Sequence, residues 1–396
     1  MKRRILFLEG NIDGTVGGSY YVMIDLVNAL DKTRYEPVIG FHTDNFLVPG
    51  LRKQGIETII FDNPASFEFK SKSLNKTLAP AKKIINLFRK FILPAIRYSK
   101  FLRKHNIDLV DVNNSITRNH KWMLAAMIAG IPCISHEMGI NTRFNFAARF
   151  FGKRLKSIIC VSNIIKETMN NVGLNYSNIT VIHNGLDVKR YALKETPDEL
   201  RVKYKLGHND KVIGVVGNIK KWKGQETIVR AMGLLITRHP DLKCFLVGAV
   251  SEVCDDTTRY KEKLDQIVEE NGLKGSVIFT GFQKNPIDYM NLMDVVVHTS
   301  IDPEPFGIVL LEAMFLSKPL ITTTIGGPAE IIENNKSGLL VEPGKPELLA
   351  EAVKKLLDDP VYAAGLGKQG NVRLHQQFTI EKNAEQTMKI FNNAFQ

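Results

Sequence analysis

Short apolar strands alternate with helical segments along this chain, which predicts an α/β protein with two doubly wound, Rossmann-like parallel sheets. Continuous β-branched runs are typical of strands buried on both faces. Apolar residues at helical spacing separate these runs. The length of 396 residues exceeds what one hydrophobic core usually holds, so we expect two domains.

The first series of strands occupies the N-terminal half of the chain. A helix over 20–30 follows the first strand, with Val22, Leu26 and Leu30 on one face. The strands are expected at 5–8, 37–41, 58–61, 109–113, 133–135, 158–161 and 180–183.

The second series begins after a polar stretch near residue 190. Its strands are expected at 212–216, 244–247, 277–280, 295–299, 320–323 and 338–341. The predicted domains are therefore 1–190 and 191–378, and a final helix over 379–396 is expected to return to the first domain.

The composition of the chain indicates its cellular compartment and the charge of its partner. Four cysteines lack metal-ligand spacing and indicate reduced core thiols of a cytoplasmic protein. The apolar run after Arg4 stops at Glu9, too early for a signal peptide, and no segment is long enough to span a membrane. Residues 1–190 hold 28 basic and 14 acidic side chains, whereas the remainder carries a net charge of −2. An anionic partner of the first domain is the simplest interpretation.

The most informative motif is Glu304-Pro-Phe-Gly-Ile-Val-Leu-Leu-Glu312, which follows the strand at 295–299. Pro305 suits the entry to a helix, and Gly307 permits close approach of a ligand to the backbone. The free amides of that helix favour a phosphate, while the two carboxylates accept sugar hydroxyls. Two solvated helix charges are the alternative.

A second loop, 217–224, follows the first strand of the second domain. Gly217, Asn218, Lys220 and Lys223 lie in it, directly before a predicted helix over 225–238. Glycines and lysines at a helix N-terminus predict a diphosphate-binding loop, although a solvated basic turn has the same composition. Gly326-Gly327, after another strand, either faces the same ligand or forms a tight turn.

Two features of the first domain also follow strand ends. His136 ends a strand and is a candidate for catalysis, with a structural histidine as the alternative. Gly17 and Gly18 belong to a glycine-rich loop after the first strand, which is predicted to approach a phosphate or sugar closely.

A basic amphipathic segment lies between residues 70 and 104, which hold eleven basic and no acidic side chains. Apolar residues cover one side of a helix from Ile84 to Ile96, and Pro94 is expected to kink or break it. Such helices bind anionic membrane surfaces, but the apolar side also suits packing on the sheet. No nucleic-acid module accompanies the charge. The basic side chains of the predicted surface are Lys82, Lys83, Arg89, Lys90, Arg97 and Lys100.

Taken together, these motifs resemble the retaining glycosyltransferases of the GT-B fold, family four. The resemblance rests on the Glu304 to Glu312 motif, on Gly326-Gly327-Pro328 and on Ile182-His-Asn-Gly-Leu-Asp187. It implies an acceptor-binding N-terminal domain and a nucleotide-sugar-binding C-terminal domain that face a cleft.

The resemblance also implies individual roles. Glu312 would hold the ribose hydroxyls, Glu304 the donor sugar, and His136 the sugar near the reacting carbon. Lys223 would neutralise the leaving diphosphate, helped by amides around Phe306, Gly307 and Ile308. No metal or other cofactor is expected, so cationic groups must stabilise the departing charge.

One position departs from the family pattern. Asn218 stands where the family usually has arginine. Substitution by Lys220 or Lys221 is one alternative, although a lysine lacks the bidentate fork of arginine. The resulting prediction is a cytoplasmic, peripheral membrane hexosyltransferase. Its donor would be a UDP- or GDP-sugar, and its acceptor a lipid-linked or envelope glycan such as lipopolysaccharide or capsule. A sugar-nucleotide epimerase and a non-catalytic glycan-assembly protein remain alternatives.

Overall fold

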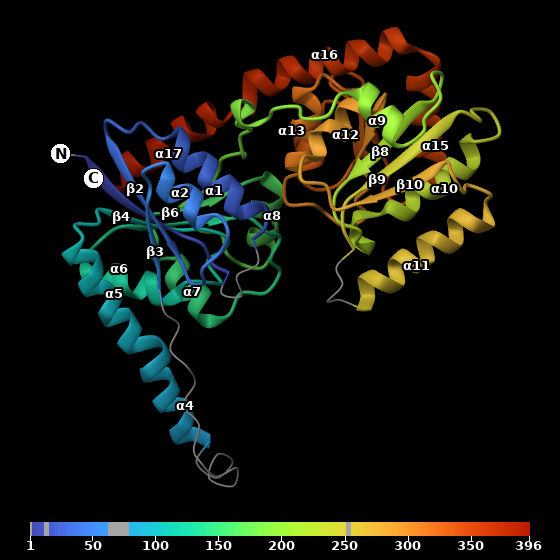
Figure 1. Cartoon of the computed structure of the whole chain (residues 1–396). Helices are drawn as coiled ribbons and strands as arrows, with labels where there is room; N and C mark the ends of the chain where they lie inside the picture. The colour runs from blue at the N-terminus through green and yellow to red at the C-terminus, as the bar shows by residue number, and fades with distance from the viewer. Residues whose placement is uncertain (1, 12–15, 62–78, 251–254) are drawn as a thin grey trace. The chain divides into compact units, whose positions relative to one another are not determined.

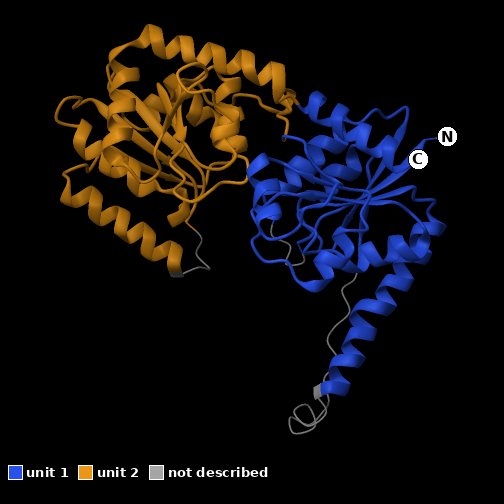
Figure 2. Cartoon of the chain, turned by 180° about the vertical axis from the view of Figure 1, so that it is seen from behind, with its two compact units in different colours: residues 1–183, 380–396 blue, residues 184–379 orange. Residues whose placement is uncertain are grey.

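The computed structural model describes residues 2–11, 16–61, 79–250 and 255–396. They form two compact units, shown in Figures 1 and 2. Unit 1 contains residues 1–183 and 380–396, and unit 2 contains residues 184–379. The sequence predicts the first division at 190/191, and the structure has it at 183/184.

The described part of unit 1 contains a parallel sheet of seven strands in the order β3-β2-β1-β4-β5-β6-β7. The order reverses beside β1, between β1 and β4, where ligands bind in sheets of this kind. The strands are β1 (Arg3–Leu8), β2 (Tyr35–Phe41), β3 (Glu57–Ile60), β4 (Leu109–Val112), β5 (Cys133–Glu137), β6 (Ser157–Cys160) and β7 (Ile179–Val181).

Helices cover both faces of this sheet (Figure 1). One face carries α1 and α17, which pack on each other, and the other carries α5, α6 and α7. The helices of unit 1 are α1 (Gly18–Ala29), α2 (Val48–Lys53), α4 (Ala79–Leu87), α5 (Leu93–Lys104), α6 (His120–Ala129), α7 (Phe146–Gly152), α8 (Asn163–Asn171) and α17 (Ile380–Ala394).

The C-terminal helix α17 is part of the core of unit 1. Its Phe391 is fully buried, and its ring centroid lies 6.2 Å from that of Phe7 and 5.8 Å from that of Tyr35. Aromatic contacts at this spacing, in addition to the buried area, fix the helix to β1 and β2.

The basic amphipathic segment is helical, but Pro94 does not break it. A π-helical turn, Phe88–Ile92, joins α4 to α5, and Pro94 lies in the first turn of α5. Proline cannot donate the normal backbone hydrogen bond, and a wider turn before it accommodates that loss. Of the predicted kink or break at this position, the break is therefore wrong, and the helix continues through an irregular turn.

The described part of unit 2 contains a second parallel sheet, with six strands in the order β10-β9-β8-β11-β12-β13. Its switch point lies between β8 and β11. The strands are β8 (Lys211–Val216), β9 (Leu242–Val247), β10 (Val277–Gly281), β11 (Val295–Val297), β12 (Leu320–Thr323) and β13 (Leu339–Val341).

The helices of unit 2 connect these strands and pack around a buried apolar core that includes Ile213, Leu246 and Ile321. They are α9 (Pro197–Lys203), α10 (Gln225–Leu235), α11 (Asp255–Glu270), α12 (Pro286–Leu292), α13 (Ile308–Phe315), α14 (Pro328–Ile331), α15 (Pro346–Asp358) and α16 (Pro360–Gln377). Two short 3-10 turns precede α9 and α10, at Val188–Arg190 and Lys221–Lys223.

The two predicted parallel sheets are thus confirmed. Of the four cysteines, Cys133, Cys160 and Cys244 are buried free thiols, and Cys254 lies outside the described residues. None of the described helices has the length and hydropathy of a membrane span.

Candidate active site

The loop between β11 and α13 carries the first glutamate of the motif. Gly307 precedes α13 with a φ of 103°, a left-handed conformation that favours glycine. Phe306 is buried, with its ring 6.2 Å from that of Phe378. The loop backbone is therefore fixed on the side of Phe306 and turns sharply at Gly307.

Gly326 and Gly327 support this loop from the end of β12. A Cβ on Gly326 would lie 2.6 Å from the backbone nitrogen and oxygen of Glu304, and one on Gly327 would lie 2.5 Å from the Cα of Phe306. The Gly327 amide donates a hydrogen bond of 2.8 Å to the carbonyl of Glu304. Of the two interpretations of this pair, the structure favours the turn, since the glycines pack against the Glu304 loop and the Gly327 amide is used there.

Three side chains hold the Glu304 carboxylate. Lys223 Nζ lies 2.6 Å from Oε1, while His298 Nε2 and Ser300 Oγ lie 2.5 and 3.0 Å from Oε2. Burial alone would raise the pKa of Glu304. The hydrogen bond from His298 and the charges of His298 and Lys223 outweigh burial, so the pKa lies well below its usual range. Glu304 is therefore a carboxylate at neutral pH.

Lys223 reaches Glu304 because two strand-end loops pack together. Gly224, with a φ of 67°, leaves no room for a Cβ, which would lie 2.1 Å from the carbonyl oxygen of Thr299. The Thr299 hydroxyl donates a 2.8 Å hydrogen bond to the Lys223 carbonyl, and the Lys223 ammonium lies 4.3 Å from the centroid of the Trp222 ring. The predicted phosphate lysine and the predicted sugar glutamate thus form one ion pair.

The remaining residues of the predicted diphosphate loop surround this lysine. Gly217 has a φ of 151°. Its backbone packs closely against Gly248, since a Cβ on Gly248 would lie 2.1 Å from the carbonyl oxygen of Gly217. Asn218 is exposed, and its carbonyl accepts a hydrogen bond from Gln225. Lys220 is half-buried at the start of the turn. Their contact with phosphate stays a prediction.

The N-terminus of α10 fits the predicted phosphate site less well than that of α13. The Glu226 amide donates to the Tyr260 hydroxyl at 2.9 Å, and the Thr227 amide donates to the Gly224 carbonyl. These two amides are used within the protein. At the α13 end the Leu310 amide likewise donates to the Gly307 carbonyl, but among the described residues no side chain binds the Val309 amide, which corresponds to that of Glu226. The α13 end is therefore the better helix terminus for an anion.

Asn218 gives a direct test of the phosphate clamp. Asn218→Arg places a guanidinium on an exposed position five residues before Lys223, where the family usually has it. We expect turnover to rise by about tenfold, the effect of one added charged hydrogen bond. Steady-state kinetics with the donor measure it. A loss, or no change, would indicate that Lys220 or Lys221 already neutralises the phosphate.

Glu312 lies on α13 and is partly buried. Its Oε1 accepts a 2.8 Å hydrogen bond from the Tyr191 hydroxyl. Burial raises the pKa of Glu312, while the Tyr191 hydrogen bond and the charge of Arg190 oppose that rise. A carboxylate of this kind gains from hydroxyl donors such as those of a ribose.

Glu312→Ala tests the predicted ribose contact. Loss of hydrogen bonds to a carboxylate should weaken nucleoside diphosphate binding by about 1.5–3 kcal/mol. Titration calorimetry with the nucleotide alone measures this, and Glu351→Ala, on the exposed side of α15, is the matched control. Equal affinities for the wild type and Glu312→Ala would remove Glu312 from the nucleotide site.

In unit 1 the predicted histidine lies at the carboxyl edge of the sheet. His136 is 5% exposed, and its Nε2 lies 3.1 Å from Asp111 Oδ2 on β4. The carboxylate fixes the orientation of the ring, as both a structural and a catalytic histidine require. The catalytic role stays a prediction.

Two carboxylates that the sequence analysis did not predict lie at the same edge of the unit 1 sheet. Glu137 is buried and accepts hydrogen bonds from the Ile116 amide and, at 3.3 Å, from the Ser135 hydroxyl. Burial raises the pKa of Glu137 to about 7, and the hydrogen bond from Ile116 limits the rise. Glu9, after β1, accepts 2.7 Å and 2.8 Å hydrogen bonds from Asn113 and Gly10. Glu9 and Glu137 are single acidic residues at strand ends, and no sequence motif would have identified them.

The glycine loop of unit 1 leads into α1. Gly17 is the N-cap of this helix, and a Cβ on Gly17 or Gly18 would meet no heavy atom of the described residues within 4 Å. Packing inside unit 1 therefore does not require glycine here. Gly14 lies outside the described residues, and the predicted ligand contact stays a prediction.

The two halves of the basic amphipathic helix differ. In α5, Ala95 and Tyr98 are buried, and Tyr98 stacks on Trp122 at 4.0 Å. In α4 and the turn that follows, Ile84, Leu87 and Phe88 are 68, 57 and 51% exposed. Figures 1 and 2 show α4 extending away from the rest of unit 1. Packing on unit 1 therefore accounts for α5 and not for α4.

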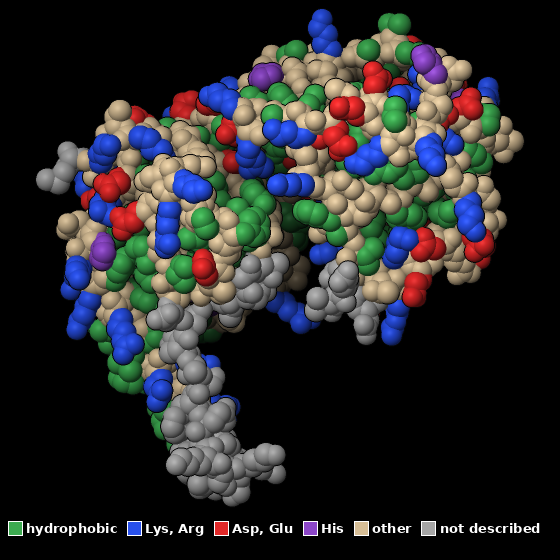
Figure 3. All heavy atoms as spheres, in the orientation of Figure 1, with side chains coloured by type: hydrophobic (Ala, Val, Ile, Leu, Met, Phe, Trp, Pro, Cys, Tyr) green, Lys and Arg blue, Asp and Glu red, His purple; other side chains and the backbone are tan. Residues whose placement is uncertain are grey.

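The basic side chains of the predicted membrane surface lie along the same helix. Figure 3 shows hydrophobic and basic side chains together where this helix meets the rest of unit 1. Lys82 and Lys90 are half-buried, and Lys83, Arg89, Arg97 and Lys100 are exposed. Lys70, Lys72 and Lys76 lie outside the described residues.

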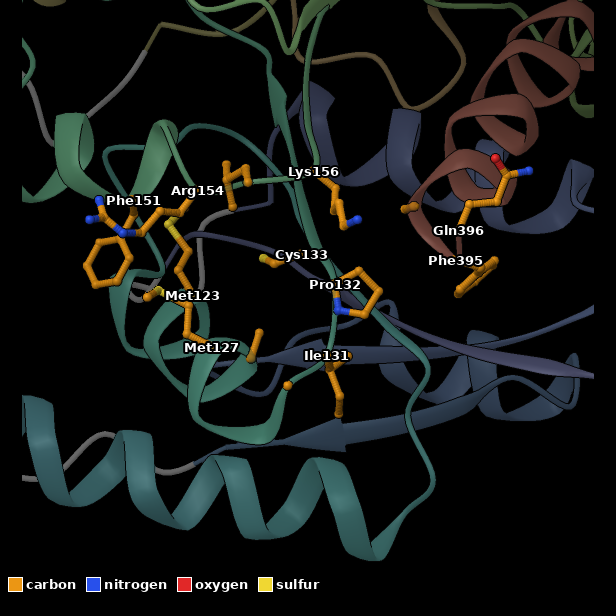
Figure 4. A pocket seen from close by; sticks show the side chains of 14 residues that line it. Met123, Met127, Ile131, Pro132, Cys133, Phe151, Arg154, Lys156, Phe395 and Gln396 are labelled. Carbon is orange, nitrogen blue, oxygen red and sulfur yellow. The ribbon is translucent and has the colours of Figure 1, made fainter.

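A separate pocket of about 340 Å³ lies at the other, amino edge of the unit 1 sheet (Figure 4). Cys133 and Met123 point into it, and Arg154 and Lys156 flank it. None of the predicted site residues lines this pocket.

Comparison with known families agrees with this geometry. The sequence model described as "Glycosyltransferase Family 4" matches residues 16–190, and the one described as "Glycosyl transferases group 1" matches residues 197–373. The chain belongs to the GT-B glycosyltransferases of family four. The first match includes β2 to β7 and the second includes β8 to β13, so the family accounts for most of both sheets.

Individual members of the family are only distantly similar. N-acetyl-alpha-D-glucosaminyl L-malate synthase of Bacillus anthracis is 27% identical over 307 residues, covering 75% of this chain and 77% of the relative. The capsular polysaccharide biosynthesis glycosyltransferase CapM of Staphylococcus aureus is 28% identical over 244 residues, covering 60% and 59%. The structure of HepE from Anabaena in complex with UDP superposes with a TM-score of 0.81 at 25% identity, covering 99% of this chain and 100% of HepE.

Proposed function

We propose that this protein transfers a hexosyl group from a UDP- or GDP-sugar, with retention of configuration and without a metal ion, to a lipid-linked or envelope glycan. The observation that carries the proposal is the Lys223–Glu304 pair, with Glu312 on the helix that follows Glu304. The pair combines a cation for a leaving diphosphate with a carboxylate for sugar hydroxyls. The similarity to HepE, which was solved in complex with UDP, and to the capsule glycosyltransferase CapM supports it.

The reaction needs a group that stabilises negative charge as the sugar departs. Lys223 is held by Trp222 and Glu304, so its ammonium is oriented before the donor arrives. A donor phosphate that takes Lys223 would release Glu304 Oε1 to accept a sugar hydroxyl. The two groups that form the ion pair in the free protein would therefore each contact the bound donor, Lys223 at the phosphate and Glu304 at a sugar hydroxyl.

A donor screen tests the proposal. Ligands that bind the folded state raise the melting temperature by mass action, so UDP-, GDP- and ADP-sugars can be compared at equal concentration. The donor that stabilises most is then incubated with glycan acceptors, and the anomeric configuration of the product is read by NMR. Release of isomerised sugar nucleotide without acceptor would instead indicate an epimerase. Failure of every donor to bind would contradict the proposal.

The lipid-linked acceptor is supported by the exposed side of α4 and of the π-helical turn that follows it. This helical stretch combines exposed apolar side chains with Lys82, Lys83, Arg89 and Lys90, and the combination favours the surface of an anionic bilayer. Each basic residue near such a surface contributes about 1 kcal/mol. The apolar groups then enter the interface, where water no longer surrounds them.

Vesicle sedimentation measures this prediction. The protein should bind vesicles of anionic lipid and not neutral ones, and binding should fall as salt shortens the Debye length to about 8 Å. Replacing Lys82, Lys83, Arg89 and Lys90 with Gln should abolish most of it.

The control for vesicle binding is an equal loss of charge from unit 2. Lys274, Lys284, Lys336 and Lys345 are exposed there, and replacing them with Gln should leave binding unchanged. If the wild type stays in the supernatant with anionic vesicles at low salt, α4 does not bind membranes and the acceptor is soluble.

A further inference from the structure

His298 is placed to control the orientation of Glu304. It follows β11 directly and is 4% exposed. Its Nε2 lies 2.5 Å from Glu304 Oε2, and its Nδ1 lies 2.9 Å from Thr322 Oγ1 on the neighbouring strand β12. One imidazole therefore connects the Glu304 carboxylate to the sheet.

The hydrogen of this contact must be on the histidine. An ionised carboxylate only accepts hydrogen bonds, so Nε2 carries the hydrogen and donates it to Glu304. On the other side of the ring, Nδ1 forms a hydrogen bond with the Thr322 hydroxyl. The Ser300 hydroxyl adds a 3.0 Å hydrogen bond to the same Oε2. The donors of the sheet edge thus hold Oε2, while Lys223 holds Oε1.

This division matters once a donor is bound. Under the proposed function, Lys223 has a long, flexible side chain and would leave Glu304 to bind a phosphate of the donor. Oε1 then needs an orientation that does not depend on Lys223, and the rigid imidazole at Oε2 supplies it. A misplacement of about 1 Å at such a group costs about 100-fold in rate.

We infer that His298 is a positioning residue that keeps Glu304 aimed at the donor sugar after Lys223 has moved to the phosphate. The inference rests on the proposed function, and it adds a residue that no sequence motif marks. It assigns His298 to turnover rather than to binding of the nucleotide.

Three substitutions of His298 distinguish the contribution of Nε2 from that of Nδ1. The amide nitrogen of His298→Gln reaches the place of Nε2, whereas that of His298→Asn reaches only the place of Nδ1. His298→Leu has neither. We expect kcat to stay within about tenfold of the wild type in the Gln variant and to fall by about 10- to 100-fold in the Asn and Leu variants. KM for the donor should change less than kcat, and UDP or GDP affinity should not change.

A purely structural histidine would give another result. Its loss would lower the melting temperature, and Gln would rescue no better than Asn. Thr322→Val, which removes the partner of Nδ1, provides a second variant if the Asn variant does not fold, and should lower kcat in the same direction. His239→Asn, elsewhere on unit 2, is the control.

A double-mutant cycle completes the experiment. If His298 acts through Glu304, His298→Asn should change kcat little in a Glu304→Gln background. If the kcat losses of His298→Asn and Glu304→Gln are additive, or if the Gln, Asn and Leu variants of His298 have equal kcat values, the inference is overturned while the proposed function stands. A wild-type protein without transfer or donor hydrolysis for any sugar nucleotide would overturn the proposed function, and the inference with it.

Discussion

Glu304→Ala should reduce kcat by about 100- to 1,000-fold and leave nucleoside diphosphate binding intact. The carboxylate is ionised and oriented before the donor binds, and removal of one preorganised polar group from an active site has an effect of this size. Because the substitution also frees Lys223 from its 2.6 Å ion pair, nucleotide affinity should stay equal or increase. Single-turnover kinetics measure the first effect and titration calorimetry the second.

Two further variants separate chemistry from folding. Glu304→Gln keeps the shape of the side chain, so a stable Gln variant with a similar loss of kcat would assign the effect to the charge. Asp302→Ala, an exposed acid in the same loop, should be nearly silent. A Glu304→Ala protein with normal kcat would exclude Glu304 from contact with the reacting sugar.

The sequence predicts both sheets because buried parallel strands have a strong local signal. The strand before the motif is the continuous apolar run Val295-Val296-Val297, a pattern typical of a strand that is covered on both faces, and all three side chains are buried. The carboxyl end of this strand also locates the motif, since ligands bind at that edge of parallel sheets. The position of Glu304 in the fold is therefore predictable from a few residues.

The contacts of the motif are not predictable in the same way. Lys223 and Glu304 are 81 residues apart, and they meet because β8 is the neighbour of β11 in the sheet. His298 contacts Glu304 through the shape of one loop and Thr322 through the register of β12. Strand order and register depend on the whole core, and no local pattern records them.

The amphipathic helix shows the same difference between pattern and packing. Helical periodicity marks an apolar side from Ile84 to Ile96, but it does not show which part of that side is buried. The stack of Tyr98 on Trp122 secures the second half, while Leu87 in the first half remains exposed. Pro94 likewise predicts a kink or a break, and the structure has a π-helical turn before it through which the helix continues.

Lys223→Ala should lower kcat by about 100- to 1,000-fold and raise KM for the donor much less. Charge grows on the diphosphate as the sugar departs, so an ammonium beside it stabilises the transition state more than the ground state. The loss of the cation leaves Glu304 bound to His298 and Ser300, and its carboxylate therefore keeps two of its three partners. Steady-state kinetics over a range of donor concentrations separate kcat from KM.

Folding and charge must again be distinguished for Lys223. Removing one member of a buried ion pair destabilises a protein by about 3–5 kcal/mol, so the melting temperature of each variant is measured first. Lys223→Arg keeps the charge and should retain more activity than Lys223→Ala. Lys284→Ala, at an exposed position of unit 2 outside this loop, is the control. If KM rises and kcat stays constant, Lys223 binds donor and transition state equally, and another cation must stabilise the leaving group.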